Sequence, residues 1–500
     1  MTFNSYIFIL VFLPLALLGW YGLNYIRLKK IPLLFITGMS LWFYGYFNPS
    51  YLWIIISTIL CNYMLSLFLE RRKEQVSQSP FVKTVIMIAA ILLNLGVLFY
   101  YKYFDFFLEN INAVFGADYS LRHIILPLGI SFFTFQQLSY IIDRCLGKAE
   151  HTDLLTYSAF VTFFPQLVAG PIVLHSELIP QLKKEEKRFN PDMFYDGLIC
   201  FVLGLTKKVI LADNFAIIVN HGYDNPILLD TFSTLAVIVA YAFELYFDFS
   251  GYSDMAIGLG KMFGIELPVN FRSPYKAATL KELWTRWHMT LTRFLSTYVY
   301  YPLGGSRKGK VRRYINILIV FTLSGIWHGA SWNFVLWGFI TGLIVVWNSM
   351  EIIGYPNDGS KFPKLKLPRP IGVILTFIGF SLSIVIFRSP DLKTAGQMFA
   401  NLGKGWTGNI YRVASVIELP EIYVLKQAVT MLAPQMLQLF NLLVLIVMLI
   451  AGFYICSRKN SLEICEKYRE KAWFPPVIVL LLAYCIISFS QVSTFIYFNF

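Results

Sequence analysis

Charged residues are scarce in this chain. Only 14% of its 500 residues are Asp, Glu, Lys or Arg, whereas about a quarter is usual in a soluble domain. Hydrophobic residues make up 57% of the chain, and the mean hydropathy is +0.59. This balance excludes an ordinary soluble protein and predicts an all-α polytopic membrane protein, in which lipid covers the apolar surface.

Cysteine is also rare, and the sequence lacks several common catalytic motifs. The chain has six cysteines, and none forms a close CxxC pair, so we expect no disulfide framework and no zinc site. The motifs HExxH and GxSxG do not occur. A zinc protease or a serine hydrolase therefore has no support in the sequence, and we expect no metal.

Long apolar runs fill most of the sequence. A helix needs about 20 apolar residues to cross the hydrocarbon layer, and on that basis we expect roughly eleven full spans. Shorter or broken runs predict re-entrant segments at 155–173, which Pro165, Gly170 and Pro171 interrupt, and at 251–264. The first run has no basic residue before it and no small-residue cleavage site after it, so we expect a retained helix rather than a signal peptide. The candidate spans are 6–25, 31–47, 51–69, 83–101, 124–142, 196–219, 231–249, 314–329, 332–350, 371–388, 437–456 and 474–491.

The formal net charge of +13 has a simple explanation in a membrane protein. Lys and Arg collect in cytoplasmic loops, and the richest loop runs from Arg272 to Arg313. Placing this loop in the cytoplasm puts both chain ends outside. No basic stripe with interleaved aromatics lies outside the spans, so nothing indicates nucleic-acid binding.

We expect one integral membrane unit with three parts. Residues 1–122 would form N-terminal transmembrane helices, 123–350 a catalytic core, and 351–500 C-terminal helices. An extracytoplasmic insert is expected near 389–436.

Two glycine-rich stretches resemble nucleotide-binding motifs only in part. GGSRKGKV (304–311) has Val311 where a P-loop needs Ser or Thr, so it reads as a basic cytoplasmic turn. Its Arg307 and Lys308 remain candidates to contact donor phosphates. GLGKMFG (258–264) has the wrong spacing for a dinucleotide site and predicts close helix packing instead.

Two histidines stand out because the chain has only six. His288 lies in KELWTRWHMT, beside Arg286 and Trp287, where an interfacial belt of aromatic and basic residues is an alternative interpretation. His328 follows Trp327 in LSGIWHGASW, inside an apolar run. Ionisable groups at membrane depth are costly and often functional, and histidine suits proton transfer near neutral pH. A packing histidine bonded to a backbone carbonyl is the alternative for His328.

Three acids lie in the apolar stretch FELYFDFSGYSDMAIG: Glu244, Asp248 and Asp254. Such acids can form a proton relay or an ion site, or hold cationic and histidine side chains in place. We favour the orienting role. A proton-coupled transporter would use the relay, but it predicts internal repeats in the two halves, and the polar islands fall in one central block.

The motifs together resemble the membrane-bound O-acyltransferase family, and within it the alginate O-acetylase-like branch. The similarity covers most of the chain, is strongest over 126–340, and has the two histidine motifs in the family's order. One departure is Ser296-Thr297, where relatives often carry Arg-Asp. The matching segments are LPLGISFFTFQQLSYIID (126–143), FFPQLVAGPI (163–172), YFDFSGYSDMAIG (246–258), LPVNFRSPYKAATLKELWTRWHMTL (267–291), YVYYPLGGSRKG (298–309), SGIWHGASWNFVLWG (324–338) and the closing FIYFNF (495–500).

This resemblance implies a ring of tilted helices with re-entrant segments around a central tunnel. It implies transfer of an acyl group from a thioester donor to a hydroxyl, with His328 as the catalytic base and His288 as the second active-site histidine. No bound cofactor is implied, and acetyl-CoA is the expected donor, with an acyl carrier thioester as the alternative. Expected supporting or binding residues are Trp327, Trp287, Arg286, Asp248, Asp254, Arg307 and Lys308.

The expected function is O-acetylation of an exported cell-surface polysaccharide at the cell membrane. The donor would arrive from the cytoplasm, and the acceptor would be the polysaccharide or an extracytoplasmic partner enzyme. Transfer of D-alanine from a carrier protein to teichoic acid is the alternative within the family, and peptidoglycan is another acceptor that the sequence leaves open. A proton-coupled transporter and an inactive scaffold are the alternatives from other classes.

Overall fold

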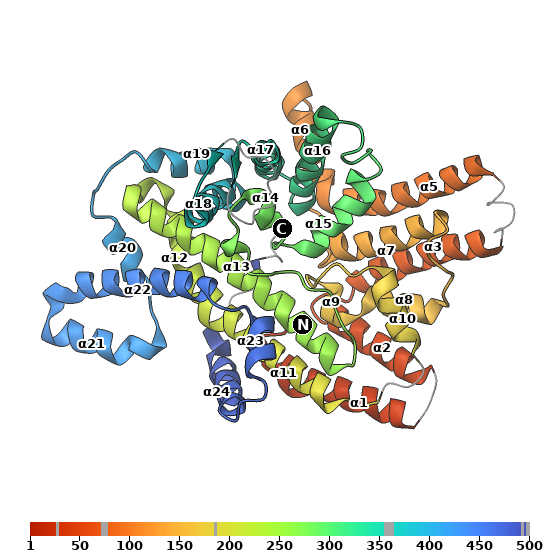
Figure 1. The fold of residues 1–500 in the computed structure, drawn as a ribbon, viewed down its shortest axis with the longest axis horizontal. Coiled ribbons are helices and arrows are strands. Elements are labelled where there is room, and N and C mark those ends of the chain that lie inside the picture. Colours follow the sequence, from red (N-terminus) through yellow and green to blue (C-terminus); the bar gives the residue numbers. More distant parts are fainter. Residues whose placement is uncertain (27–29, 72–78, 185–187, 355–364, 492–494, 497–500) are drawn as a thin grey trace. The chain divides into compact units, whose positions relative to one another are not determined.

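The chain is almost entirely helical (Figure 1). The computed structural model describes residues 1–26, 30–71, 79–184, 188–354, 365–491 and 495–496. Within them the only strands are β1 (Ile353–Gly354) and β2 (Leu365–Lys366), which pair in parallel. Helices satisfy every backbone hydrogen bond internally, which hydrocarbon requires. The predicted all-α polytopic class is confirmed.

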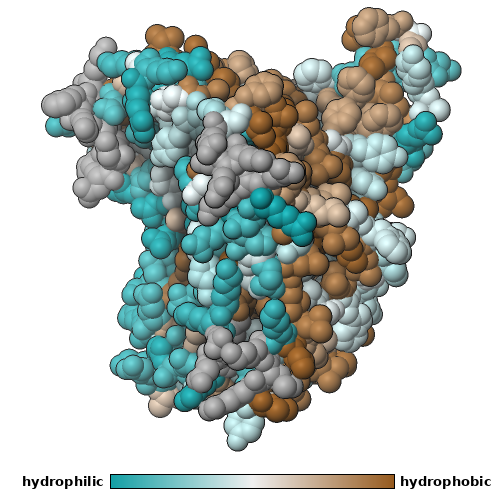
Figure 2. Space-filling model, turned by 90° about the vertical axis from the view of Figure 1, so that its right-hand side faces the viewer, coloured by the Kyte–Doolittle hydropathy of each residue, from teal (hydrophilic) through white to brown (hydrophobic). Residues whose placement is uncertain are grey.

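Seven helical stretches in the described part of the chain are long and apolar enough to cross a membrane. Large hydrophobic side chains lie at the surface of most of them, and Figure 2 shows broad areas where hydrophobic residues face outward. The protein is therefore a multi-pass membrane protein. The seven are Phe8–Tyr25, Tyr51–Arg71, Pro80–Phe115, Thr231–Met262, Trp332–Ser349, Arg369–Arg388 and Pro434–Ser457, and shorter apolar helices are Ile31–Gly45 and Phe474–Ile487.

This count is lower than the roughly eleven spans expected from a ~20-residue minimum, because several apolar runs are shorter helices or parts of longer ones. The 196–219 run divides into α11 (Pro191–Thr206), the π-helical turn η3 (Lys207–Ala212) and α12 (Asp213–Asp224). The prediction of a separate re-entrant segment at 251–264 is wrong. This stretch continues the 231–249 run in one helix, α13 (Thr231–Met262). The expected interruption in 155–173 is confirmed, since α8 (Leu154–Thr162) and α9 (Phe164–Leu167) are separate.

Gly251 is a position within α13 where the helix packs against α11. A Cβ at this position would lie 2.7 Å from the carbonyl oxygen of Gly204. The glycine therefore allows α13 to approach α11 closely. Gly258 does the same further along α13, where a Cβ would lie 2.5 Å from the carbonyl oxygen of Gly197, as the GLGKMFG spacing predicts.

The described chain forms two compact units. The first comprises Met1–Val202 and Tyr252–Val269. Besides α8, α9 and most of α11, it contains η1 (Phe8–Phe12), α1 (Leu13–Tyr25), α2 (Ile31–Gly45), α3 (Tyr51–Arg71), α5 (Pro80–Leu98), η2 (Phe99–Tyr103), α6 (Phe104–Phe115), α7 (Ile130–Cys145) and α10 (His175–Lys183).

A buried amide network joins three helices of this first unit. Asn62 of α3 and Asn94 of α5 exchange hydrogen bonds of 3.0 and 2.8 Å through their side-chain amides. Asn62 also donates to the side-chain oxygen of Gln137 in α7, at 3.0 Å. All three side chains are at most 2% exposed. Because lipid offers no replacement partner, this mutual bonding fixes how the three helices pack.

The second unit comprises Leu203–Gly251 and Asn270–Phe500. The expected insert near 389–436 consists mainly of short helices within this unit. Besides η3, α12, β1 and β2, the unit contains η4 (Pro226–Leu228), η5 (Pro274–Lys276), α14 (Leu280–Trp284), α15 (Met289–Leu295), η6 (Ser296–Tyr300), α16 (Lys310–His328), α17 (Trp332–Ser349), α18 (Arg369–Arg388), α19 (Leu392–Asn401), α20 (Ile410–Ser415), η7 (Pro420–Ile422), α21 (Tyr423–Leu432), η8 (Pro434–Met436), α22 (Leu437–Ser457), α23 (Ser461–Tyr468), α24 (Phe474–Ile487) and η9 (Ser488–Gln491).

The closest helix pair in this unit is α16 and α17, which lie side by side. A Cβ on Gly338 of α17 would collide with the carbonyl oxygen of Phe321 in α16 and lie 3.0 Å from Cα of Gly325. The two backbones are therefore in direct contact, and only glycine fits at the crossing.

Replacement of Gly338 by alanine is expected to destabilise the protein. Alanine alone favours a helix by about 1 kcal/mol over glycine, but overpacking here costs about 1–3 kcal/mol. Gly379→Ala in α18 is the matched control, because its Cβ would find Leu280 Cδ1 only at 4.0 Å. The apparent melting temperature in detergent should fall for Gly338→Ala and hold or rise for Gly379→Ala. Equal shifts for both would disprove the contact.

Candidate active site

His328 is the last residue of α16 and is 7% exposed. Its ring lies among aromatic side chains. The ring centroids of Trp327, Trp337 and Phe387 are 4.9, 5.5 and 5.2 Å away. Helix packing through Gly325 and Gly338 holds the end of α16 against α17. The imidazole is therefore fixed in a dry, aromatic environment.

His288 lies between α14 and α15, outside the helices that qualify as membrane spans. Its backbone has φ 44° and ψ 49°, in the left-handed region. A non-glycine residue there is strained by about 1–3 kcal/mol. Such strain is common at functional sites, and here it turns the imidazole into the protein, where it is 1% exposed.

Asn270 determines which nitrogen of His288 carries the proton. Its side-chain oxygen accepts from the Thr290 backbone N–H at 3.3 Å and from the Thr290 hydroxyl at 2.9 Å. The same oxygen faces Nδ1 of His288 at 3.1 Å. Because a backbone N–H only donates, the facing atom of Asn270 is an acceptor, and Nδ1–H of His288 donates to it. Nε2 is then the basic nitrogen of the neutral ring.

Burial also keeps His288 uncharged. Loss of hydration lowers the pKa of its imidazole from 6.5 to about 3. The edge of the ring meets the face of Phe249 at a centroid distance of 4.7 Å and an angle of 90°. At neutral pH this histidine therefore offers a lone pair and no charge.

The two histidines, which are 40 residues apart in the sequence, meet in this unit. Their ring centroids are 6.4 Å apart. Trp327 lies beside both, 6.0 Å from His288 and 4.9 Å from His328. Two imidazoles in a dry aromatic setting can take, hold and return a proton, which is what activation of a hydroxyl requires.

A cavity of about 190 Å³ lies against His288. One wall comes from α14 and α15, and the opposite wall comes from α16, where Ser324 lies one turn before His328. The π-helical turn η6 contributes Ser296 and Tyr300. The departure Ser296-Thr297 from the pattern of relatives thus falls at this cavity. No lining residue is Asp, Glu, Lys or Arg.

Asp248 lies in a different polar cluster from the two histidines. Lys208 donates to Asp248 at 2.7 Å and to Asp213 at 2.8 Å, and the backbone N–H of Ile496 donates to Asp248 at 3.0 Å. Lys208 and Asp248 are each 1% exposed. The cluster fastens α13 to η3, α12 and a piece of the C-terminal stretch. The rest of the closing FIYFNF, residues 497–500, lies outside the described residues.

The other expected supporting residues have varied surroundings. Trp287 packs among aromatics, 5.1 Å from Phe271 and 5.0 Å from Phe380. Arg286 pairs with Glu282, which also binds Arg369. Asp254 is buried in the first unit.

Arg307 and Lys308 are exposed in the turn before α16. Gly304, Gly305 and Gly309 of this turn have φ values of 100°, 56° and 91°, which only glycine adopts easily. A glycine-rich basic turn is therefore confirmed. Contact with donor phosphates remains a prediction.

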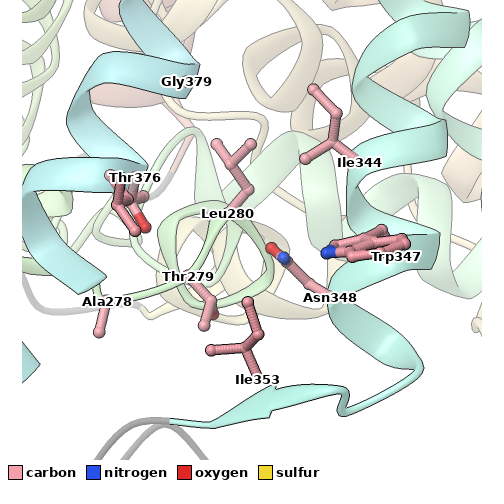
Figure 3. A pocket seen from close by; sticks show the side chains of 10 residues that line it. Ala278, Thr279, Leu280, Ile344, Trp347, Asn348, Ile353, Thr376 and Gly379 are labelled. Atoms are coloured by element: carbon pink, nitrogen blue, oxygen red, sulfur yellow. The ribbon is translucent and has the colours of Figure 1, made fainter. Parts of the chain in front are cut away.

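A second cavity, of about 230 Å³, lies apart from the histidine cluster. Figure 3 shows Trp347 and Asn348 of α17 and Thr376 and Gly379 of α18 around it, with Leu280 of α14 between them. Neither histidine lines it. The walls are largely apolar, and nothing there provides an acid or a base.

Two residues of these clusters escaped the sequence analysis. Asn270 lies in LPVNF, and a neutral amide in a loop carries no signal until its partner is known. Lys208 had a visible signal, since a lysine inside the apolar run 196–219 must find an anion.

Fold and site together define a class: a multi-pass helical membrane protein with two buried histidines beside one uncharged cavity. Comparison with known proteins makes the assignment specific. Residues 146–352 match the membrane-bound O-acyltransferase family, and both histidines lie inside this segment. The chain belongs to this family and is an acyltransferase.

Several relatives align with more than half of the chain. The peptidoglycan O-acetyltransferase of Helicobacter pylori is 37% identical over 79% of this chain and 78% of its own length. The probable alginate O-acetylase AlgI of Pseudomonas putida is 34% identical over 80% of this chain and 79% of its own length. The teichoic acid D-alanyltransferase of Streptococcus thermophilus is 28% identical over 52% of this chain and 68% of its own length.

Stability should fall with acid partly because of His288. The pKa of its ring is about 3 in the folded protein and about 6.5 in the unfolded chain. Below pH 6.5 the unfolded chain therefore binds the extra proton, and this loss of stability grows until about pH 3. His288→Asn removes the titrating group, and asparagine tolerates the left-handed backbone.

The measurement is the apparent melting temperature of both proteins between pH 7.5 and about 4.5, a range chosen from the same linkage argument. The wild-type curve should decline more steeply than that of His288→Asn. Carboxylates contribute equally to both curves. Parallel curves would show that His288 is not held neutral in the folded protein.

Proposed function

We propose that this chain is an O-acetyltransferase of the cell membrane. It moves an acetyl group from acetyl-CoA on the cytoplasmic side to a hydroxyl of an exported cell-surface polysaccharide, directly or through an extracytoplasmic partner enzyme. The observation that carries the proposal is the pair of buried histidine rings, 6.4 Å apart beside the cavity at His288, in a chain of this family.

His328 is the general base in this proposal. Its imidazole takes the proton of the acceptor hydroxyl as the oxygen attacks the thioester carbonyl carbon. The new C–O bond forms, and the carbonyl oxygen becomes an oxyanion. When the oxyanion collapses, the C–S bond breaks and the imidazolium returns its proton to the leaving thiolate. A positioned base of this kind contributes about 10²–10⁴-fold.

His288 supports this step as a neutral ring. Its Nδ1–H is engaged by Asn270, so Nε2 can accept a hydrogen bond from a neighbouring hydroxyl of the acceptor, which leaves the attacking hydroxyl free to donate its proton to His328. The low pKa of His288 keeps a second positive charge away from His328 while that ring becomes an imidazolium.

The uncharged cavity supports acetyl over D-alanyl transfer. A D-alanyl group carries an ammonium ion, and burial of an unpaired ammonium is strongly unfavourable. The cavity beside His288 has no carboxylate in its lining. An acetyl group is neutral and needs none. Acetyl transfer is also supported by the two relatives that are named as acetylating enzymes, because they align with more of the chain than the D-alanyltransferase does.

The names of the two acetylating relatives support a polysaccharide as the acceptor, and peptidoglycan and an alginate-like polymer are both candidates. The relatives named for these two polymers are 37% and 34% identical to this chain, so the test includes both polymers as acceptors. A proton-coupled transporter has no support, because Asp248 is engaged by Lys208 and the family is one of acyltransferases.

His328→Ala should abolish acetyl transfer by purified, folded protein. The assay supplies acetyl-CoA with peptidoglycan fragments or alginate oligosaccharides and measures released CoA thiol and acetylated product. Loss of the base should lower turnover by about 10²-fold or more. His221→Ala is the control, because His221 lies in α12 and is not among the described residues that line the cavity at His288.

Equal turnover by wild type and His328→Ala would exclude His328 as the base. If wild-type protein consumed a D-alanyl carrier thioester but not acetyl-CoA, D-alanyl transfer would replace acetylation as the function. Consumption of neither thioester would contradict the proposed function.

A further inference from the structure

Two tryptophans beside the histidines carry indole N–H groups that lack an acceptor within the described part of the chain. Trp284 ends α14, and Trp337 lies in α17. They are 8% and 3% exposed. Among the residues that the structure describes, neither indole nitrogen has a hydrogen-bond acceptor, and both nitrogens are shielded from solvent.

Such an arrangement is costly unless a ligand relieves it. A buried donor without an acceptor costs about 1–3 kcal/mol. Phenylalanine would fill most of the same space without this cost. Aromatic packing alone therefore does not explain two unpaired N–H groups in one cluster.

The location of the two indole N–H groups indicates which ligand accepts their hydrogen bonds. The ring centroid of Trp337 is 5.5 Å from that of His328, and Trp284 lies 6.0 Å from Trp337. Trp284 also lines the cavity that His288 lines. Trp284 thus lines the cavity at His288, and Trp337 packs against both Trp284 and His328, the ring that acts on the acceptor in the proposed function.

We propose that the indole N–H groups of Trp284 and Trp337 bind the carbonyl oxygen of the acyl donor. This inference rests on the proposed function. As the hydroxyl attacks, the carbonyl π electrons move onto that oxygen, and both N–H groups donate to the oxyanion that forms. The bonds strengthen with the charge, which lowers the barrier more than it strengthens binding.

The test compares Trp284→Phe, Trp337→Phe and the double variant with wild type. Phenylalanine keeps an aromatic ring and removes the N–H. Loss of one dedicated oxyanion donor lowers kcat by about 10²–10³-fold in other enzymes, and we expect at least a 10-fold loss for each variant here. KM for acetyl-CoA should change by less than about threefold, because the effect falls on the transition state.

Trp347→Phe is the matched control. It makes the same substitution on the same helix as Trp337, but Trp347 is 53% exposed and lies at the other cavity. Its kcat should match that of wild type. If a phenylalanine variant does not fold, benzothienylalanine at the same position replaces the N–H by sulfur and keeps the bicyclic shape.

A second readout needs binding but no turnover. Acetyl-CoA with a ¹³C carbonyl is bound to His328→Ala protein, and the carbonyl stretch is recorded by infrared difference spectroscopy. Hydrogen bonds from the indoles lower this frequency. Adding Trp337→Phe or Trp284→Phe should raise it, and adding Trp347→Phe should not.

An unchanged kcat and an unchanged frequency in the Trp284 and Trp337 variants would overturn the inference. A raised KM with unchanged kcat would overturn it too, because the indoles would then only hold the donor. These outcomes differ from failure of the proposed function, in which wild-type protein consumes a D-alanyl thioester but no acetyl-CoA. In that case the same variants, assayed with a D-alanyl thioester, test whether the indole N–H groups contact the carbonyl oxygen of the donor.

Discussion

A polar group in hydrocarbon has no water to bind, so the protein itself has to supply its partner. This constraint accounts for the buried polar clusters of the structure. In the first unit, Asn62, Asn94 and Gln137 satisfy one another. In the second, Lys208 and Asp248 neutralise each other. At the candidate active site, the same requirement lets Asn270 hold one nitrogen of His288 and leave the other basic. The requirement that buried polar groups have protein partners thus explains both the buried polar clusters and the basic nitrogen of His288.

The sequence predicted the class, the family and the histidine pair because these depend on local signals. Hydropathy gives membrane helices, and motif order gives the family. Prediction from the sequence failed where tertiary packing determines the structure. The stretch 251–264 was expected to form a separate segment, yet it continues α13, where Gly251 is a contact point. The orienting role expected for Asp248 fits its ion pair with Lys208, but the sequence did not identify this partner. Asn270 went unnoticed because its importance lies in Thr290 and His288, which only folding brings to it.

The aromatic shell around the histidines serves several purposes at once. It excludes water, which strengthens each electrostatic interaction inside. It keeps His288 neutral through burial. Its indoles add directional donors to an otherwise apolar wall. The cavity itself contains hydroxyls and rings but no charged side chain. Ser296 continues this uncharged character into η6.

The backbone contact between Gly325 and Gly338 also determines which side of the cavity can yield. It makes α16 and α17 a stiff pair, since closely packed backbones leave no room to slide. The opposite wall is built from α15, seven residues long, and the π-helical turn η6, five residues long. Short elements with few neighbours open at lower free energy than long packed helices. The α15–η6 side of the cavity therefore yields more easily than α16, which keeps His328 at its end against α17.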